Sequence, residues 1–110
     1  MFKKEDELRT KELLKGISME LLCHGDKALM ARFLLRGGHE LPMHSHPYEQ
    51  VGYMVSGHMV LVIDGTDHDV LEGDSWCIPQ DVEHGAHILE DSLVVEVFSP
   101  PRDDYLALEE

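Results

Sequence analysis

The chain has 110 residues, a formal net charge of −13 and no apolar run that approaches the length of a membrane span. A charge this negative argues against nucleic acid and against anionic membrane surfaces as partners, since binding either requires clustered Lys and Arg. Hydrophobic residues make up 43% and charged residues 28%, which indicates a globular chain and not a disordered one. The length fits one domain, 1–110, with a modest core that a homodimer would help to stabilise.

The first sixteen residues are charged and only loosely patterned. They predict either a short helix or an edge strand that reaches a partner subunit, and the pattern leaves both open. This start lacks the apolar segment of a secretory signal, so we expect a cytoplasmic protein. Cys23 and Cys77 are too few for a disulfide framework and form no C-x-x-C pair, so we expect two reduced, partly buried thiols.

From Ile17 onward, short apolar runs alternate with turn residues, as in an all-β protein. Asp64-Gly65 predicts a hairpin, and Pro100-Pro101 must end the last strand because proline cannot donate to a ladder. Short strands at this spacing predict a sandwich or a small barrel, with residues 101–110 packed on its outside or on a partner. The expected strands lie within 17–23, 27–35, 50–55, 59–63, 68–71, 75–79, 87–90 and 93–98.

Histidine is frequent, with eight copies in the chain, and it is the commonest metal ligand. In a strand, side chains at i, i+2 and i+4 lie on one face, and His44, His46 and Gln50 share this parity. Two imidazoles and an amide oxygen can thus converge on zinc, iron, nickel or copper. A lone H-x-H pair is weak support for a metal site, because histidine also occurs on loops. Four histidines lie beside turn residues and are expected in solvent: His24, His39, His58 and His68. His87 has the opposite parity to His84 and is expected to point outward.

Two spaced motifs give the histidines a context. The first is a glycine, five residues, H-x-H, three residues, a possible ligand, six residues and a glycine: Gly38, His44, His46, Gln50 and Gly57. The second is a glycine, five residues, a proline and then a histidine: Gly73, Pro79 and His84. Through these motifs, the segment of about residues 28–99 resembles members of the cupin superfamily. The resemblance implies an all-β cupin double-stranded β-helix, or jelly-roll barrel, with an N-terminal arm (1–16), a tail (100–110) and one divalent metal ion on His44, His46, Gln50 and His84.

Cupins usually carry a glutamate where this chain has Gln50. Either the site is a three-histidine site with Gln50 as a weak fourth ligand, or the metal is lost. We favour the first, since all three histidines are present, and expect one Zn, Ni, Mn or Fe ion. An amide in place of a carboxylate leaves the metal more electropositive, which suits Lewis-acid chemistry better than redox work on oxygen.

The tail LVVEVFSPPRDDYL, together with HSHPYEQVGYMVSG, resembles a cupin branch associated with pectin and alginate breakdown. Members of that branch open or linearise 4,5-unsaturated uronates left by polysaccharide lyases. The branch places an acid, commonly an aspartate, an aromatic and an arginine around the pocket. In this chain they correspond to Glu96, Phe98 and Arg102.

The residues themselves allow the same roles. Glu96 and Phe98 share parity on the last strand, so a carboxyl and a hydrophobic wall can face the interior, as a general acid/base requires. Arg102 can hold a carboxylate in a bidentate pair. Structural roles are open for all three: Glu96 in an ion pair, Phe98 in the core and Arg102 as a surface charge.

A uronate is an anion and the chain is strongly acidic, so the metal and Arg102 must reverse the potential inside the barrel, with Arg32 as a possible second cation. A cupin dioxygenase and a non-catalytic sugar- or metal-binding module are the alternative functions, because fold does not determine function.

Overall fold

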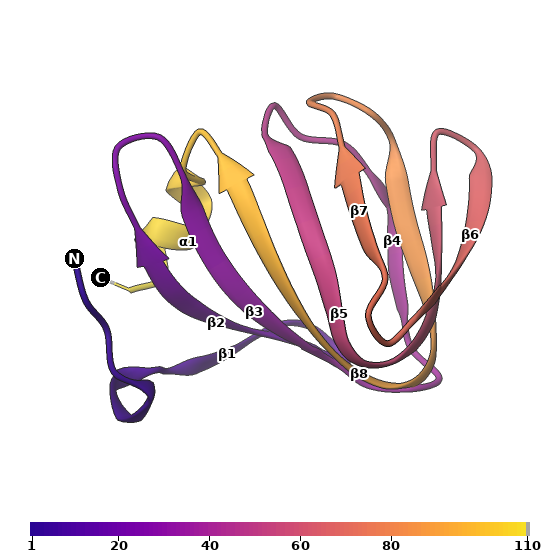
Figure 1. Cartoon of the computed structure of the whole chain (residues 1–110), viewed down its shortest axis with the longest axis horizontal. Coiled ribbons are helices and arrows are strands. Elements are labelled where there is room, and N and C mark those ends of the chain that lie inside the picture. The colour runs from indigo at the N-terminus through magenta and orange to yellow at the C-terminus, as the bar shows by residue number, and fades with distance from the viewer. Residues whose placement is uncertain (110) are drawn as a thin grey trace.

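The computed structural model describes residues 1–109 and is built almost entirely of strands. In chain order the elements are η1 (Glu5–Glu7), β1 (Thr10–Leu14), β2 (Ile17–His24), β3 (Leu29–Leu35), β4 (Glu40–His44), β5 (Glu49–Ile63), β6 (Thr66–Leu71), β7 (Ser75–Ile78), β8 (His84–Ser99) and α1 (Asp103–Ala107) (Figure 1). The all-β prediction is confirmed.

All the strands join in one sheet, in the order β1-β2-β3-β8-β5-β6, with β4 paired to β8 and β7 to β5. The two long strands, β5 and β8, run side by side through the middle of the molecule (Figure 1). The first half of β8 pairs with β4 and its second half with β3, while β5 pairs first with β7 and then with β6. The sheet therefore folds over on itself into the two facing layers of a jelly roll.

The fold-over is made at bulges, and here the predicted strand boundaries were wrong. The runs 50–55 and 59–63 are one bent strand, and so are 87–90 and 93–98, because the residues between them form register shifts and not turns. Gly57 adopts φ +117°, and a Cβ there would lie 2.2 Å from Ser92 Oγ. That hydroxyl accepts the backbone N–H of His58 and donates to the Glu90 carbonyl, which fixes the crossing of the two strands.

Both terminal segments of the described residues, 1–16 and 100–109, pack with the other strands. The N-terminal arm forms a 3-10 turn and then strand β1, which pairs with β2 of its own chain. The tail was expected to pack on the outside of the barrel or on a partner; instead α1 buries Tyr105 against Phe33 and Phe98, with ring centroids 6.1 and 5.5 Å away. The helix lies beside β2 and β3 at one end of the sheet (Figure 1). The tail therefore contributes to the core.

Strand register orders the interior in layers. In the first half of β8, His84 pairs with His44 of β4 and Ile63 of β5. Ala86 pairs with Leu41 and Leu61, and Ile88 pairs with Met59. The other half of β8 places Phe98 beside Gln50, Glu96 beside Gly52 and Val94 beside Met54. Polar groups thus gather where β4 ends and β5 and β8 begin, above an aliphatic interior. Among the described residues, no helix is long and apolar enough to cross a membrane, and the cytoplasmic location stays a prediction.

Candidate metal centre

Three histidines meet at the end of the barrel where β4 stops. His44 is the last residue of β4, His46 lies in the following loop and His84 opens β8, directly opposite His44 in the ladder. One ring nitrogen from each lies within 4.8 Å of the other two. The ring centroids are 4.2 Å apart for His44 and His84 and 4.9 Å apart for His46 and His84. The predicted cluster is therefore assembled by strand pairing, and it can hold a metal ion.

Each imidazole is oriented by a backbone carbonyl two residues away. Nδ1 donates to the carbonyl of Pro42 in His44 (2.8 Å), of Tyr48 in His46 (3.0 Å) and of Val82 in His84 (2.9 Å). Because a carbonyl oxygen can only accept, the proton resides on Nδ1 in all three rings. Nε2 is then the free lone pair, and outer partners of this kind fix both the tautomer and the direction of a metal-binding histidine.

The contact between His46 and Gln50 is the observation that best fits a cation. His46 Nε2 lies 2.7 Å from Gln50 Oε1. The Gln50 amide nitrogen donates to Glu96 Oε2, which fixes the amide so that its oxygen points at His46. With the His46 proton on Nδ1, His46 Nε2 and Gln50 Oε1 are both hydrogen-bond acceptors, and neither can donate to the other. A bound cation satisfies both, so the donor set fits a divalent metal held by three imidazoles and one amide oxygen.

Burial keeps the cluster in its metal-binding form. The pKa of His84 is lowered to about 4, chiefly because the ring is buried, with the nearby His44, His46 and Arg102 adding to the shift. Burial also lowers the pKa of His46, followed by the positive charge of Arg102. Only neutral imidazole ligates metal, so these shifts favour metal binding at neutral pH.

Glu96 lies on the same face of β8 as Phe98, in a row with Gly52 of β5 and Trp76 of β7. Burial raises the pKa of the Glu96 carboxyl to about 7, while the Gln50 amide, Trp76 and Arg102 work in the opposite direction. The Trp76 indole N–H is buried close by without completing a hydrogen bond to a described residue. A Cβ on Gly52 would lie 2.3 Å from that indole, so the glycine makes room for Trp76 beside Glu96.

Arg102 directly precedes α1, and its guanidinium lies over aromatic rings. Its Cζ is 3.8 Å from the centroid of Tyr105, 5.0 Å from Phe98 and 5.2 Å from Tyr48. Nε and Nη2 donate to the Asp104 carboxylate at 3.1 and 2.7 Å. The side chain is only 12% exposed, so the surface-charge alternative does not describe it.

One cavity of about 410 Å³ connects these groups. Its lining is polar at the histidine end and otherwise aliphatic or aromatic, including Leu41, Met59 and Ile88. The predicted residues that line it are His44, Gln50, His84, Glu96, Phe98 and Arg102. A cavity of this size, apolar with a few convergent polar groups, is the usual form of a small-molecule site.

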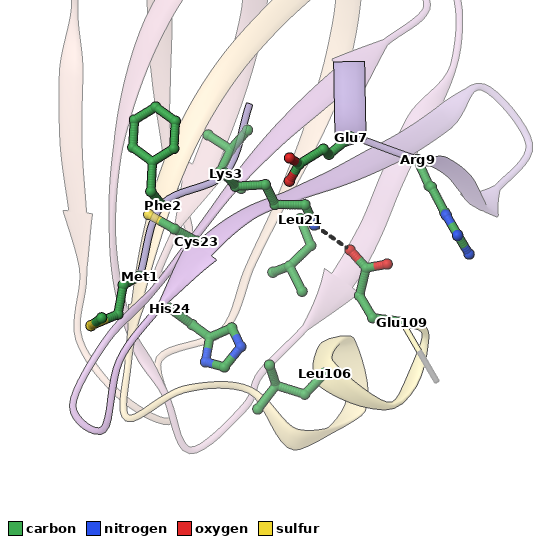
Figure 2. A pocket seen from close by; sticks show the side chains of 11 residues that line it. Met1, Phe2, Lys3, Glu7, Arg9, Leu21, Cys23, His24, Leu106 and Glu109 are labelled. Carbon is green, nitrogen blue, oxygen red and sulfur yellow. Dashed lines mark hydrogen bonds and ion pairs between the residues drawn. The ribbon is translucent and has the colours of Figure 1, made fainter. Parts of the chain in front are cut away.

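A second hollow, of about 690 Å³, lies outside the barrel between the N-terminal arm, the end of β2 and α1. Figure 2 shows Lys3 reaching across Leu21 to Glu109, with Cys23 beside Phe2. Although it is the larger space, it is more open, and it touches none of the histidines of the metal centre.

Several expectations away from the centre need correction. Arg32 has the opposite parity to the inward residues of β3 and pairs with Glu20 (2.8 Å) and Glu5 on the outer face, so it is no second cation of the cavity. Cys23 and Cys77 are free but exposed, not partly buried. The histidines expected in solvent fall into two groups: His24 and His68 are exposed, whereas His39 and His58 are half-buried. His87 points outward as predicted and contacts Glu40.

Sequence reasoning missed four residues that shape the centre: Tyr48, Trp76, Asp104 and Tyr105. The spacing of Asp104 and Tyr105 after Arg102 was a usable signal, because a helix that begins at residue 103 brings both next to that arginine. Trp76 had no such signal, since its position over Gly52 depends on strand pairing.

A model of the cupin domain matches residues 31–99, more than half of the chain. The chain is a cupin. Among curated relatives, the pectin degradation protein KdgF of Dickeya dadantii (strain 3937) is 29% identical over 104 residues, covering 93% of this cupin and 94% of the relative. The H2HPP isomerase of Bacillus subtilis is 31% identical over 97 residues, covering 86% of this cupin but only 41% of the relative.

Solved structures similar to this chain include cupins and a KdgF protein. KdgF from Halomonas sp. superposes with a TM-score of 0.89 at 30% identity, covering 96% of this cupin and 97% of that chain. An RmlC-like cupin from Shewanella frigidimarina also gives 0.89, at 26% identity and with 94% of each chain covered. A salicylate 1,2-dioxygenase from Pseudoaminobacter salicylatoxidans, at 17% identity and a TM-score of 0.77, shares the fold alone. The predicted cupin fold and the resemblance to the pectin-degradation branch are confirmed.

Proposed function

We propose that this cupin linearises 4,5-unsaturated uronates with the help of one divalent metal ion held by His44, His46, Gln50 and His84. The observation that carries the proposal is that the carboxyl group of Glu96 and a cation, Arg102, line the same cavity as the histidine cluster. The near full-length similarity to KdgF proteins supports this choice of substrate.

The reaction is an isomerisation, so every atom of the substrate is kept. The O1–H proton of the cyclic hemiacetal leaves, the bond from C1 to the ring oxygen breaks, and C1 becomes an aldehyde. The electron pair left on the ring oxygen gives the C5 enolate, which becomes a ketone when C4 gains a proton. One group that accepts the first proton and returns the second is sufficient.

Glu96 fits this role because of its surroundings. It lies beside Gln50, and therefore beside the metal ligands, with Phe98 next to it on the inner face of β8. A bound divalent metal would polarise the sugar oxygens as a Lewis acid. Glu96 takes the hydroxyl proton and delivers it to C4, and Arg102 holds the uronate carboxylate by charge-assisted hydrogen bonds. The aliphatic wall excludes water while the proton moves.

The test is incubation of metal-loaded protein with the products of a pectate or alginate lyase. The conjugated enol ether of the substrate absorbs near the ultraviolet edge, and this absorbance should decay faster with the protein than without it. Unchanged decay with fully loaded protein would contradict the proposal. Iron-dependent oxygen consumption would then favour a dioxygenase, and tight sugar binding without turnover would favour a binding module.

We also propose a homodimer formed through the outer face of the sheet. Apolar residues stand there in rows across β3, β8 and β5: Met30 with Val97 and Val51, and Leu34 with Leu93. Exposed large apolar side chains on this face include Met30, Leu34, Val51, Tyr53 and Val55. Several exposed large apolar side chains on one face are typical of a protein interface. Light scattering should give a dimer mass at micromolar concentration, and a Tyr53→Lys variant should give a monomer; a monomeric parent protein would refute the dimer.

A further inference from the structure

Aromatic rings and one carboxylate together determine where the Arg102 guanidinium lies. Tyr105, Phe98 and Tyr48 surround its Cζ at 3.8, 5.0 and 5.2 Å. Rings hold a cation by their faces but place few constraints on rotation of the guanidinium in its own plane. The direction in which its N–H groups point is therefore set by the carboxylate.

That carboxylate belongs to Asp104, two residues further along the chain. It accepts from Arg102 Nε at 3.1 Å and from Nη2 at 2.7 Å, a two-point contact that fixes the plane of the guanidinium. The first turn of α1 sets the spacing, because the Leu106 N–H donates to the Arg102 carbonyl at 3.0 Å. Asp104 is thus held in place by the helix that Arg102 begins.

An arginine has five N–H donors, and Asp104 uses one on Nε and one on Nη2. The Nη1–Nη2 edge keeps three donors, enough to chelate a second carboxylate. We propose that Asp104 is a positioning residue that directs this free edge of Arg102 to the carboxylate of the substrate. The inference rests on the proposed function only for the identity of the substrate, since any small carboxylate in the cavity tests the geometry.

The sign of the effect separates positioning from simple electrostatics. Asp104 adds a negative charge to the cavity wall of a protein whose net charge is already −13. If its charge alone mattered, removing it would favour an incoming anion. If it positions Arg102, removing it weakens anion binding even though the wall becomes less negative. The two accounts thus predict opposite changes in affinity.

The chain supplies a matched control. Asp103 is the adjacent residue of α1, exposed and without a side-chain hydrogen bond or ion pair in the described part of the chain. Asp103→Ala removes the same charge from the same turn without touching Arg102. It should leave anion affinity unchanged or slightly higher, whereas Asp104→Ala should lower it about tenfold, the scale of one charge-assisted contact.

The experiment uses the full chain loaded with Zn²⁺ and galacturonate, a saturated uronate that lacks the reacting double bond. Calorimetry gives its dissociation constant for the parent, Asp104→Ala, Asp104→Asn, Asp103→Ala, Arg102→Ala and the Arg102→Ala/Asp104→Ala double variant. The double variant should bind no more weakly than Arg102→Ala alone, because Asp104 acts through Arg102. Equal melting temperatures exclude unfolding, and Asp104→Asn, which preserves shape, serves if the alanine variant is unstable.

Three outcomes would overturn the inference: tighter binding by Asp104→Ala, additive losses in the double variant, or no galacturonate binding by the parent at millimolar concentration. In turnover assays, Asp104→Ala should raise KM about tenfold with kcat nearly unchanged, as expected for lost ground-state and transition-state binding alike. A parent that binds galacturonate through Arg102 but does not linearise unsaturated uronates would refute the proposed function and leave this inference standing.

Discussion

The barrel cavity and the N-terminal hollow differ in what their polar groups contact. In the barrel cavity, polar side chains contact one another, and His46, Gln50 and His84 among them are buried: Gln50 bridges His46 and Glu96, and Arg102 lies between rings and Asp104. In the N-terminal hollow, which is larger, a single ion pair joins Lys3 to Glu109 among exposed groups such as Met1 and Phe2. Volume therefore does not identify the site. Buried polar groups do, because each costs free energy unless its neighbours or a ligand satisfy it.

The largest expected effect is loss of the metal from the barrel cavity. Changing His44, His46 or His84 to alanine removes one of the three imidazoles whose free nitrogens converge, and should weaken metal binding by about a hundredfold or more. Elemental analysis of the purified variants measures this. His87→Ala is the control, since His87 lies on the same strand but points outward, and it should retain full metal. Full metal in all three cluster variants would end the metal assignment.

The exchange of Glu96 for glutamine tests chemistry without removing the cavity. The variant keeps the shape of the side chain but cannot carry the proton, so the rate on unsaturated uronates should fall roughly a hundredfold or more. Its metal content should stay at the parent level, because the oxygen of the new amide can still accept the Gln50 N–H that orients this ligand. Parent-like activity of Glu96→Gln would remove this carboxyl from the mechanism.

Some residues of the metal centre could be predicted from the sequence, and others could not. His44, His46 and Gln50 are close along the chain and do converge, but they do not share one strand face as the parity argument assumed: His44 ends β4, His46 lies in the loop and Gln50 belongs to β5. His84 needed the second motif, because its position opposite His44 depends on the pairing of β4 with β8. Strand parity placed Glu96 inside correctly. The same rule applied to Arg32 excludes it from the interior, since it alternates with Ala31 and Phe33, which are buried.

Contacts created by three-dimensional pairing could not be predicted in this way. Trp76, Gly52 and Glu96 form a row across three strands that are far apart in sequence, and only the register brings them together. The prediction for the tail was wrong for a related reason: only the folded chain brings the Tyr105 ring into the space beside Phe33 and Phe98. A single aromatic residue in a polar segment can thus decide on which side of a barrel wall the segment lies.

A smaller effect is expected at Gly52, where the cavity wall depends on close packing. A Cβ at this position would lie 2.3 Å from the Trp76 indole, so Gly52→Ala must displace the ring from beside Glu96. We expect a loss of about 1–3 kcal/mol in the free energy of unfolding, the usual cost of overpacking. Trp76 is the only tryptophan, so its fluorescence reports both the displacement and urea unfolding. Gly25→Ala is the control, because a Cβ there meets nothing within 4 Å. An unchanged emission spectrum and midpoint for Gly52→Ala would contradict this account of the wall.

The smallest effect is expected in the N-terminal hollow. Lys3 and Glu109 are 3.0 Å apart, but each side chain is 25% exposed, so water screens the pair and competes for both groups. Lys3→Ala should change the free energy of unfolding by less than about 1 kcal/mol, as is typical of surface ion pairs. Metal content and the rate on unsaturated uronates should not change, because the hollow shares no lining residue with the barrel cavity. The Lys3→Ala/Glu109→Gln double variant, measured by urea unfolding, gives the coupling between the two charges. A loss of metal or activity in Lys3→Ala would show that the two hollows are linked through α1, and the contrast drawn between them would fail.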